Sequence, residues 1–164
     1  MRRNCFLVVF SITLILLAGA SADLLSQTKA ATKAEEAPLR VALAGLVHGH
    51  ASGFFDRFQH RADLQVVGIA EADRQLAAQF AKKYGLPPGL FYSDLEEMLK
   101  ATHPQAVLAY TNTYDHRRVV EICARYDVHV MMEKPLAVSL EDARAIEEAA
   151  RAGKIGRASC RERV

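Results

Sequence analysis

Polar side chains that could support acid–base or ligand chemistry follow several short apolar runs in this sequence. Gly45–His50 follows the first run, and Glu71 follows the second. Thr111–His116 and Glu133–Pro135 follow two later runs. If the runs are parallel strands, their carboxyl ends share one sheet edge, which is where open α/β sheets bind ligands. We therefore expect the catalytic and ligand-binding residues to lie in these four loops.

The first loop reads GLVHGH and leads into a helical pattern. Gly45 suits a tight turn, and a helix that starts after it offers free N–H groups to a pyrophosphate. A full G-x-G-x-x-G motif would have glycine where Val47 and His50 stand. We interpret Gly45, Val47, His48, Gly49 and His50 as dinucleotide contacts, and an ordinary strand-to-helix turn is the alternative.

An acidic residue, Glu71, ends the second apolar run. A carboxylate at this position accepts hydrogen bonds from the adenosine ribose hydroxyls and repels a 2′-phosphate, so it favours NAD. Arg74 lies close enough in sequence to receive a 2′-phosphate, which leaves NADP open. The alternative is a solvated charge at a strand end.

Two later loops carry the residues that could reach a reacting group. Thr111 and Asn112 follow one apolar run, and His116 comes one helical turn before the next apolar face. His116 is therefore either a site residue or a packed, capping histidine. Lys134 follows the last run, and partial burial would lower the pKa of its amine and allow proton exchange with a substrate hydroxyl.

The neighbours of that lysine fix the shape of its loop. Pro135 biases Lys134 toward an extended backbone, and Glu133 precedes it; we expect all three residues at the cofactor site. By composition alone, Glu-Lys-Pro is also an ordinary loop.

A histidine pair and an isolated cysteine suggest other chemistry. His48 and His50 stand two residues apart on a turn, but no cysteine or acidic residue lies nearby at metal-ligand spacing. We therefore expect no metal site and place both histidines near the cofactor. Cys123 falls on an apolar helix face, which predicts a buried, inert thiol rather than a nucleophile.

Strand-like and helical patterns alternate along the chain and predict the elements that position these loops. The expected strands are 39–45, 64–70, 91–92, 106–110 and 128–132. Apolar residues at helical spacing fill the intervals, with Asp73, a Ser93–Glu96 capping box and a Ser139–Asp142 pair at three helix starts. Alternation of this kind predicts an α/β fold, and continuous apolar strands predict a parallel sheet covered on both faces.

Composition limits the range of function. The 164 residues carry a net charge of +2 with 24% charged side chains, and both signs are mixed. The sequence has no dense basic run, so it does not indicate binding to nucleic acid or to an anionic membrane surface.

The two ends of the chain differ from the middle. Residues 1–22 have an Arg pair, an apolar run and small-residue cleavage sites, which predict a signal peptide and an exported, periplasmic or secreted protein. The export route, Sec or twin-Arg, stays open. Residues 23–38 are expected to form a linker.

The segment 154–164 fits nothing before it. The codons ATC GGA AGA GCG TCG TGT AGG GAA AGA GTG encode its final residues and resemble a sequencing adapter. We hypothesise that this tail is not native protein, with a genuine basic tail as the alternative.

Four stretches of the sequence, taken together and in this order, resemble the N-terminal domain of the Gfo/Idh/MocA oxidoreductases. This is the family of glucose–fructose oxidoreductase and inositol dehydrogenase. The resemblance covers residues 39–153, and its most specific mark is a strand followed by Glu-Lys-Pro. The four stretches are LRVALAGLVHGH, ADLQVVGIAEADRQLAAQFAKKYG, FYSDLEEML and VLAYTNTYDHRRVVEICARYDVHVMMEKPLAVSLEDA.

The resemblance implies a Rossmann-type doubly wound sheet, a single domain of a normally two-domain protein. It implies that the Gly45 turn contacts the phosphates, Glu71 the ribose, and Asn112 and His116 the nicotinamide side. It also implies Lys134 as the catalytic lysine, in a loop that Glu133 and Pro135 shape. The glycine motif is incomplete, and Asn112-Thr113 replaces the usual Pro-Asn of the family.

Two functions follow from these observations. The first is the NAD-binding domain of an oxidoreductase, NADP being possible, whose full-length form acts on a sugar or polyol and associates as a homo-oligomer. Its substrate pocket would lie mostly in the second domain, so we expect the fragment itself to be inactive. The second is a non-catalytic dinucleotide-binding or sensor module.

Overall fold

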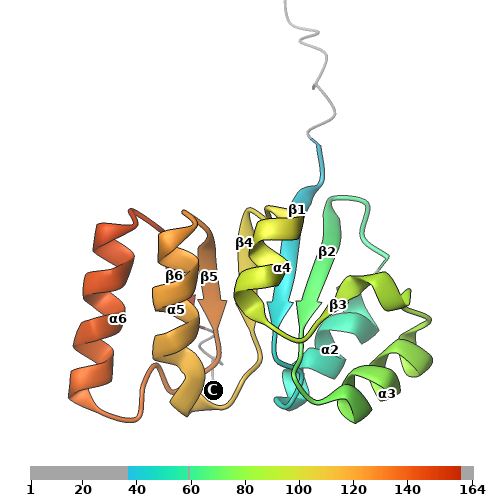
Figure 1. The fold of residues 1–164 in the computed structure, drawn as a ribbon, viewed down its shortest axis with the longest axis horizontal. Helices are drawn as coiled ribbons and strands as arrows, with labels where there is room; N and C mark the ends of the chain where they lie inside the picture. Colours follow the sequence, from blue (N-terminus) through green and yellow to red (C-terminus); the bar gives the residue numbers. More distant parts are fainter. Residues whose placement is uncertain (1–36, 59, 160–164) are drawn as a thin grey trace, which may run out of the picture. The chain divides into compact units, whose positions relative to one another are not determined.

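A computed structural model describes residues 37–58 and 60–159 of the chain. The expected signal peptide, all but the last two residues of the expected linker, and residues 160–164 lie outside the described residues. The described part contains a six-stranded parallel sheet in the order β3-β2-β1-β4-β5-β6 (Figure 1). The strands are β1 Leu39–Ala44, β2 Leu64–Ala70, β3 Phe91–Tyr92, β4 Ala106–Ala109, β5 His129–Met132 and β6 Arg157–Ser159.

Helices cross over between the strands, as a parallel sheet requires. They are α2 Gly49–Phe58, α3 Arg74–Tyr84, α4 Leu95–Thr102, α5 His116–Arg125 and α6 Leu140–Ala152, with short 3-10 turns η2 Pro88–Leu90 and η3 Thr113–Asp115. Strand order, parallel pairing and crossovers match the Rossmann-type sheet that the sequence predicted.

The two faces of the sheet pack against different helices. Successive residues of a strand point to opposite faces. Val41 and Leu43 of β1 join the cluster that contains Phe54 and Phe55 of α2, together with Phe80 of α3. Ala42 and Ala44 join the cluster built with α4, α5 and α6. Helices therefore cover both sheet faces, which accounts for the continuously apolar strands.

Small residues let the helices approach the sheet closely. A Cβ on Gly68 of β2 would lie 2.7 Å from Cγ of Met98 in α4. Met98 is fully buried, so little room exists for the extra carbon. Gly68 thus fixes the distance between β2 and the helix that follows β3.

Side-chain caps set where the helices begin. Asp73 accepts hydrogen bonds from the amides of Gln75 and Leu76, as expected from the sequence. Ser139 accepts from the Asp142 amide, also as expected. The Ser93 cap was wrong, because Asp94 accepts from the Glu97 amide instead and α4 begins one residue later. Asp94 and Glu97 form an equivalent D-x-x-E pattern that the sequence reading passed over.

The sheet extends beyond the expected domain end at Gly153. Ile155 is buried in the cluster on the α4–α6 side, and Arg157–Ser159 pair with β5 through backbone hydrogen bonds. An open sheet edge accepts a strand through backbone groups alone, so the residue pattern did not predict β6. The origin of this segment stays a prediction.

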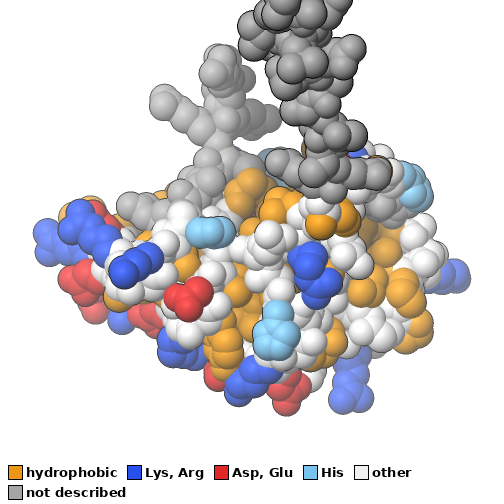
Figure 2. All heavy atoms as spheres, turned by 90° about the horizontal axis from the view of Figure 1, so that it is seen from above, with side chains coloured by type: hydrophobic (Ala, Val, Ile, Leu, Met, Phe, Trp, Pro, Cys, Tyr) orange, Lys and Arg blue, Asp and Glu red, His pale blue; other side chains and the backbone are white. Residues whose placement is uncertain are grey.

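The edge at which the strands begin faces the viewer in Figure 2. Acidic and basic side chains are interspersed there among apolar ones, without a block of one sign among the coloured residues. In the described part of the chain, no helix combines the length and apolar character needed to cross a membrane.

Candidate functional site

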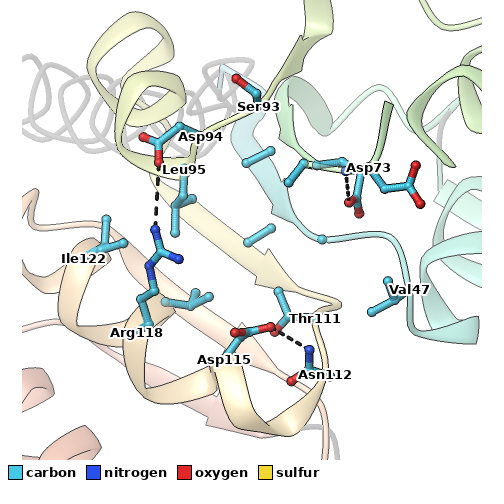
Figure 3. Close-up of a pocket in the computed structure, with 16 residues that line it drawn as sticks. Val47, Asp73, Ser93, Asp94, Leu95, Thr111, Asn112, Asp115, Arg118 and Ile122 are labelled. Atoms are coloured by element: carbon cyan, nitrogen blue, oxygen red, sulfur yellow. Dashed lines mark hydrogen bonds and ion pairs between the residues drawn. The ribbon is translucent and has the colours of Figure 1, made fainter. Parts of the chain in front are cut away.

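A pocket lies where the strand order reverses, between β1 and β4. Ligands of doubly wound sheets bind outside the carboxyl ends of the strands at this switch point. The pocket has a volume of about 380 Å³. Figure 3 shows it, and its lining comprises Ala44, Gly45, Val47, Ala70, Glu71, Ala72, Asp73, Ser93, Asp94, Leu95, Thr111, Asn112, Asp115, Arg118, Val119 and Ile122.

The turn after β1 requires glycine at position 45. Gly45 has a φ of 76°, a left-handed conformation that L side chains rarely adopt. A Cβ there would lie 2.7 Å from Cγ2 of Thr111, at the end of β4. The backbone of the turn and the residues that follow β4 therefore pack closely against each other, and both line the pocket.

Neighbouring strands hold this turn in shape. The Gly45 amide donates to the Ala70 carbonyl oxygen at 2.8 Å, and the His48 amide donates to the Tyr110 carbonyl oxygen at 3.0 Å. The Leu46 amide donates to Oε2 of Glu71 at 2.8 Å. Because these amides are engaged, the free N–H groups expected for a pyrophosphate fall to Val47 and Gly49 among the described residues. Val47 lines the pocket, and both residues are exposed.

Glu71 braces the same turn from the end of β2. Its Oε1 accepts the Asp73 amide at 2.9 Å, while Oε2 accepts the Leu46 amide. Each carboxylate oxygen has a second lone pair, so both can still accept a ribose hydroxyl. Arg74 begins α3 and lies with Glu71 along a second pocket of about 480 Å³. The structure thus brings together the two side chains expected to distinguish NAD from NADP.

The loop after β4 forms the opposite wall. Nδ2 of Asn112 donates to Oδ2 of Asp115 at 2.7 Å, so this amide is engaged within its own loop (Figure 3). Thr111 packs against Gly45, and its buried Oγ1 has no hydrogen-bond partner in the described residues. A buried hydroxyl without a partner carries a desolvation penalty that a bound polar ligand would offset.

His116 starts α5 and is 1% exposed. Its Nδ1 lies 3.2 Å from the carbonyl oxygen of Leu136, two residues after Lys134. Its Nε2 is buried and has no hydrogen-bond partner among the described residues. The His116 ring is therefore packed in the core and anchors the lysine loop, as expected for a packed histidine. Its unsatisfied Nε2 also leaves it able to act as a site residue.

Glu133 and His50 connect the loops that follow β5 and β1, which lie on either side of β4. Glu133 is 2% exposed, and its Oε1 lies 2.7 Å from Nδ1 of His50. His50 is the second residue of α2, so a contact spans the turn after β1 and the loop after β5. The sequence reading assigned both residues to the cofactor site but did not foresee that they pair.

Lys134 and Pro135 are exposed, and the peptide bond between them is cis. The described residues therefore do not supply the partial burial that would lower the pKa of the Lys134 amine. The cause is that Leu136 and Ala137, not Lys134, pack against the core. The amine stands at the sheet edge with free access to an incoming group.

Several pocket residues were missed by the sequence reading. Asp73 had been noted as a helix cap only. Ser93 and Asp94 follow β3, so applying the strand-end rule to that strand would have found them. Arg118 pairs with Asp94 at 4.0 Å and ties α5 to the start of α4 (Figure 3). The strand-end rule could not have found Arg118, because this residue lies within the first turn of α5 and not in the loop before it.

The interior thiol is outside this chemistry. Cys123 is fully buried in α5, and burial raises its pKa to about 12. A thiol with that pKa stays protonated and unreactive at neutral pH. Its expected role as a packing residue is confirmed by this burial.

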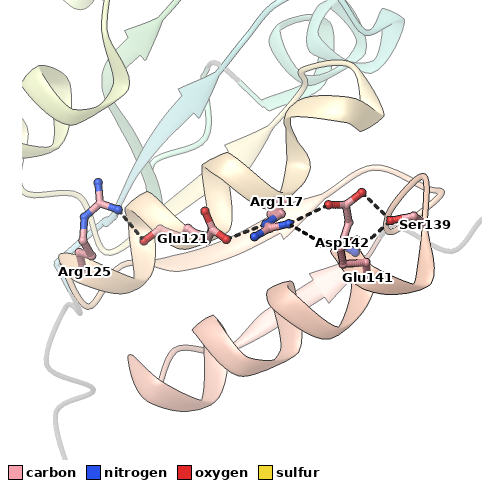
Figure 4. Close-up of polar contacts among 6 residues, drawn as sticks. All are labelled: Arg117, Glu121, Arg125, Ser139, Glu141 and Asp142. Carbon is pink, nitrogen blue, oxygen red and sulfur yellow. Dashed lines mark hydrogen bonds and ion pairs between the residues drawn. The ribbon is translucent and has the colours of Figure 1, made fainter.

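A polar network fixes the helices behind the lysine loop. Arg117 of α5 pairs with Glu121 on its own helix, and with Glu141 and Asp142 at the start of α6 (Figure 4). The Ser139 hydroxyl donates to Asp142 at 2.7 Å. The loop from β5 to α6 is thus held at both ends, by His116 and by this network.

The residues present fit a dinucleotide. Gly45 lines the pocket in a turn that leaves no room for a Cβ, Glu71 offers hydroxyl acceptors at the neighbouring strand β2, and Thr111 on the β4 side presents a buried hydroxyl without a partner among the described residues. Along the sheet edge, from β2 through β1 to β4, these groups follow the order ribose, phosphate and reacting end.

Comparison with known sequences gives a consistent result. The profile described as "Oxidoreductase family, NAD-binding Rossmann fold" (Gfo/Idh/MocA) matches residues 39–156. Trans-1,2-dihydrobenzene-1,2-diol dehydrogenase of Bos taurus is 33% identical over 97 residues, 58% of this chain and 28% of that protein. Myo-inositol 2-dehydrogenase of Thermotoga maritima is 31% identical over 94 residues, 57% of this chain and 28% of that protein.

Solved structures share the fold. An oxidoreductase from Agrobacterium radiobacter, crystallised with NAD+, L-tartaric acid and magnesium, superimposes with a TM-score of 0.66 at 22% identity. The match covers 74% of this chain and 34% of that one. The chain thus spans about a third or less of the length of these relatives.

Proposed function

This chain belongs to the Gfo/Idh/MocA family of NAD-binding oxidoreductases, and we propose that it forms the NAD-binding domain of an enzyme that oxidises or reduces a sugar or polyol CH–OH group. The observation that carries the proposal is the Gly45 turn, which lines the pocket at the β1/β4 switch point and is braced by Glu71. The polyol substrate class is supported by the similarity to myo-inositol 2-dehydrogenase.

Each end of the dinucleotide has its own set of residues in this proposal. The amides of Val47 and Gly49 bind the diphosphate at the N-terminus of α2, where the helix dipole favours anions. Glu71 accepts the ribose hydroxyls, and its charge disfavours a 2′-phosphate, so NAD binds more tightly than NADP. Thr111 and the unsatisfied Nε2 of His116 face the nicotinamide and substrate end.

Bound NAD supplies the hydride acceptor or donor. Lys134 Nζ exchanges the hydroxyl proton with the substrate, as a general base in oxidation and a general acid in reduction. Glu133 and His116 hold the backbone on either side of that lysine, through His50 and the Leu136 carbonyl respectively. Lys134 is exposed in this structure, so its proton-transfer role depends on a substrate that covers it.

Calorimetric titration of the full chain with NAD, and separately with NADP, tests dinucleotide binding. We expect both nucleotides to bind. The Kd for NAD should be lower than that for NADP by between about threefold and tenfold, where tenfold corresponds to 1.4 kcal/mol. Absence of heat with either nucleotide, in protein shown to be folded by circular dichroism, would contradict the proposal.

The second candidate is a non-catalytic dinucleotide-binding or sensor module, and the exposure of Lys134 favours it for the 164-residue chain alone. We expect this chain to bind NAD without measurable oxidation of polyols. Lys134→Ala in a protein that also carries the substrate-binding part should abolish turnover and leave NAD affinity unchanged. Unchanged turnover would refute the catalytic role of Lys134, whereas NAD binding without turnover by the parent would favour the sensor.

We also propose that the protein is exported, on the pattern of residues 1–22. Cell fractionation that compares the parent with a variant lacking the Arg2–Arg3 pair tests this. A wholly cytosolic pool of the parent would overturn it.

A further inference from the structure

Three potential metal ligands meet at the junction between the first turn and the Glu-Lys-Pro loop. His48 and His50 come from the turn and the start of α2, and Glu133 comes from the end of β5. One ligand atom from each residue lies within 4.8 Å of the others. Small shifts of the side chains would bring these atoms to the spacing of a shared ion.

Glu133 has an acceptor that the protein leaves unused. Its side chain is 3% exposed, and its Oε2 is buried without a hydrogen-bond partner in the described part of the chain. Oε1 contacts Nδ1 of His50 at 2.7 Å. Burying a carboxylate with one unsatisfied oxygen costs free energy unless a cation or donor compensates it. The unpartnered Oε2 therefore indicates that a positively charged ligand, not a group from the described residues, binds this oxygen.

The two imidazoles approach each other edge to face. Their ring centroids are 4.7 Å apart with an interplanar angle of 69°, so they do not stack in parallel. The His50 amide contacts Nδ1 of His48 at 3.2 Å, a long bond that a rotation of the His48 ring would release. His50 is half-exposed, which gives an ion a path to the site from solvent.

We propose that His48, His50 and Glu133 bind a divalent transition-metal ion such as Zn²⁺ or Co²⁺. Two imidazole nitrogens and one carboxylate oxygen suit these ions better than Mg²⁺ or Ca²⁺, which prefer oxygen ligands. Three protein ligands leave a coordination position for water or an anionic group. The ion replaces the proton shared by His50 and Glu133 and satisfies the orphaned Oε2.

The fold supplies the ligand that the local sequence lacked. The expectation of no metal rested on the lack of a nearby third ligand for the histidine pair. Glu133 follows His50 by 83 positions and reaches it because β1 and β5 both end at the same sheet edge. Binding of the ion requires no dinucleotide, so it is separable from the proposed function.

Titration of the full chain with CoCl2, without nucleotide, tests the site. Co²⁺ bound by nitrogen and oxygen in a low-coordinate site absorbs in the visible range, and ZnCl2 should displace it. We expect His50→Ala, His48→Ala and Glu133→Gln each to weaken Co²⁺ binding by at least about tenfold, the scale of losing a metal-site partner. His103→Asn is the matched control, since Asn tolerates the left-handed backbone at this exposed helix end.

The variants separate a specific site from other metal-binding groups. His50→Ala leaves Oε1 of the buried Glu133 without its partner, so we expect a lower unfolding temperature without metal, and circular dichroism must show that the variant is folded before it is titrated. If the parent fails to bind Co²⁺, or if the folded His50→Ala variant binds it as tightly as the parent, the proposal is overturned. Thiolate-to-cobalt absorption that persists in all three variants would also overturn it by assigning the ion to cysteines.

Discussion

The two halves of the sheet's carboxyl edge differ in how completely the protein satisfies them. On the β1–β2 side, Glu71 uses both carboxylate oxygens to hold backbone amides, and Gly45 is hydrogen-bonded to β2. On the β4–β5 side, His116 and Glu133 each retain a buried atom without a partner. Among the described residues, buried side-chain atoms without a hydrogen-bond partner therefore lie on the β4–β5 side and not on the β1–β2 side.

This difference separates affinity from chemistry. A prearranged turn lowers the cost of ordering on binding, so the β1–β2 side should dominate nucleotide affinity. The exposed Lys134 and the unsatisfied groups of His116 and Glu133 should instead contribute to the reaction or to ion binding. Mutations on the two sides should accordingly have different effects.

The largest effect is expected for Gly45→Ala. The new Cβ would clash with Thr111 and occupy a backbone conformation that costs energy for alanine. We expect a loss of about 2–4 kcal/mol in the free energy of unfolding, and NAD binding below detection. Urea denaturation and calorimetry measure the two losses.

Gly53→Ala provides the matched control for that substitution. Gly53 lies inside α2, and a Cβ there meets nothing within 4 Å. Alanine should stabilise the helix by about 0.5–1 kcal/mol and leave NAD affinity unchanged. Equal damage from both substitutions would show that the Gly45 turn has no special role.

Glu71→Gln should have the next largest effect. The amide keeps the shape of the side chain but loses one acceptor and the charge. We expect NAD affinity to fall by about tenfold, the equivalent of one charge-assisted hydrogen bond, while NADP affinity falls less. Parallel titrations measure the NAD:NADP ratio, and an unchanged ratio would remove Glu71 from the ribose site.

A smaller, pH-dependent effect is expected from Asp142, far from the nucleotide turn. Hydrogen bonds from Ser139 and then Arg117 hold the pKa of its carboxyl below the ordinary value of 3.8. A lowered folded-state pKa stabilises the fold above the unfolded value and loses that contribution as the pH falls through the folded value. Asp142→Asn should lower the unfolding temperature slightly at pH 7, and the difference should fade below pH 4.

The pH series itself can contradict this account of the α5–α6 network. A difference between the parent and Asp142→Asn that grows as the solution is acidified would mean that the carboxylate does not stabilise the fold. NAD affinity should be unchanged at neutral pH, because the Asp142 carboxyl belongs to the network of Figure 4 and not to the pocket.

The smallest effect on affinity is expected for Lys134→Ala. The side chain is exposed, so its removal should leave both NAD affinity and the unfolding temperature of the 164-residue chain unchanged. A drop in NAD affinity of more than about tenfold would indicate a direct contact with the nucleotide and break the contrast between the two halves.

Much of this arrangement followed from sequence patterns. Hydrophobic periodicity predicted β1 to β5 and their helices, and the strand-end rule predicted the turn at Gly45 and the position of Glu71. Local motifs have no access to pairings across the sheet, so the contact of His50 with Glu133 was not foreseen. The cap of α4 was misplaced because Ser93 and Asp94 are both good N-cap residues, and only packing selects between them.

Burial was the least predictable property. The sequence does not say whether Lys134 is buried, and in the structure Leu136 packs against the core while Lys134 is exposed. The β6 strand likewise depends on an open backbone edge and not on side-chain pattern.

Hydrogen–deuterium exchange of the full chain, with and without saturating NAD, tests the central claim most directly. If NAD binds at the β1/β4 switch point, peptides that contain Gly45–Gly49 and Glu71–Asp73 will exchange more slowly, while those covering α6 will not change. Protection confined to α6, or no protection despite measured binding, would contradict this placement of the nucleotide.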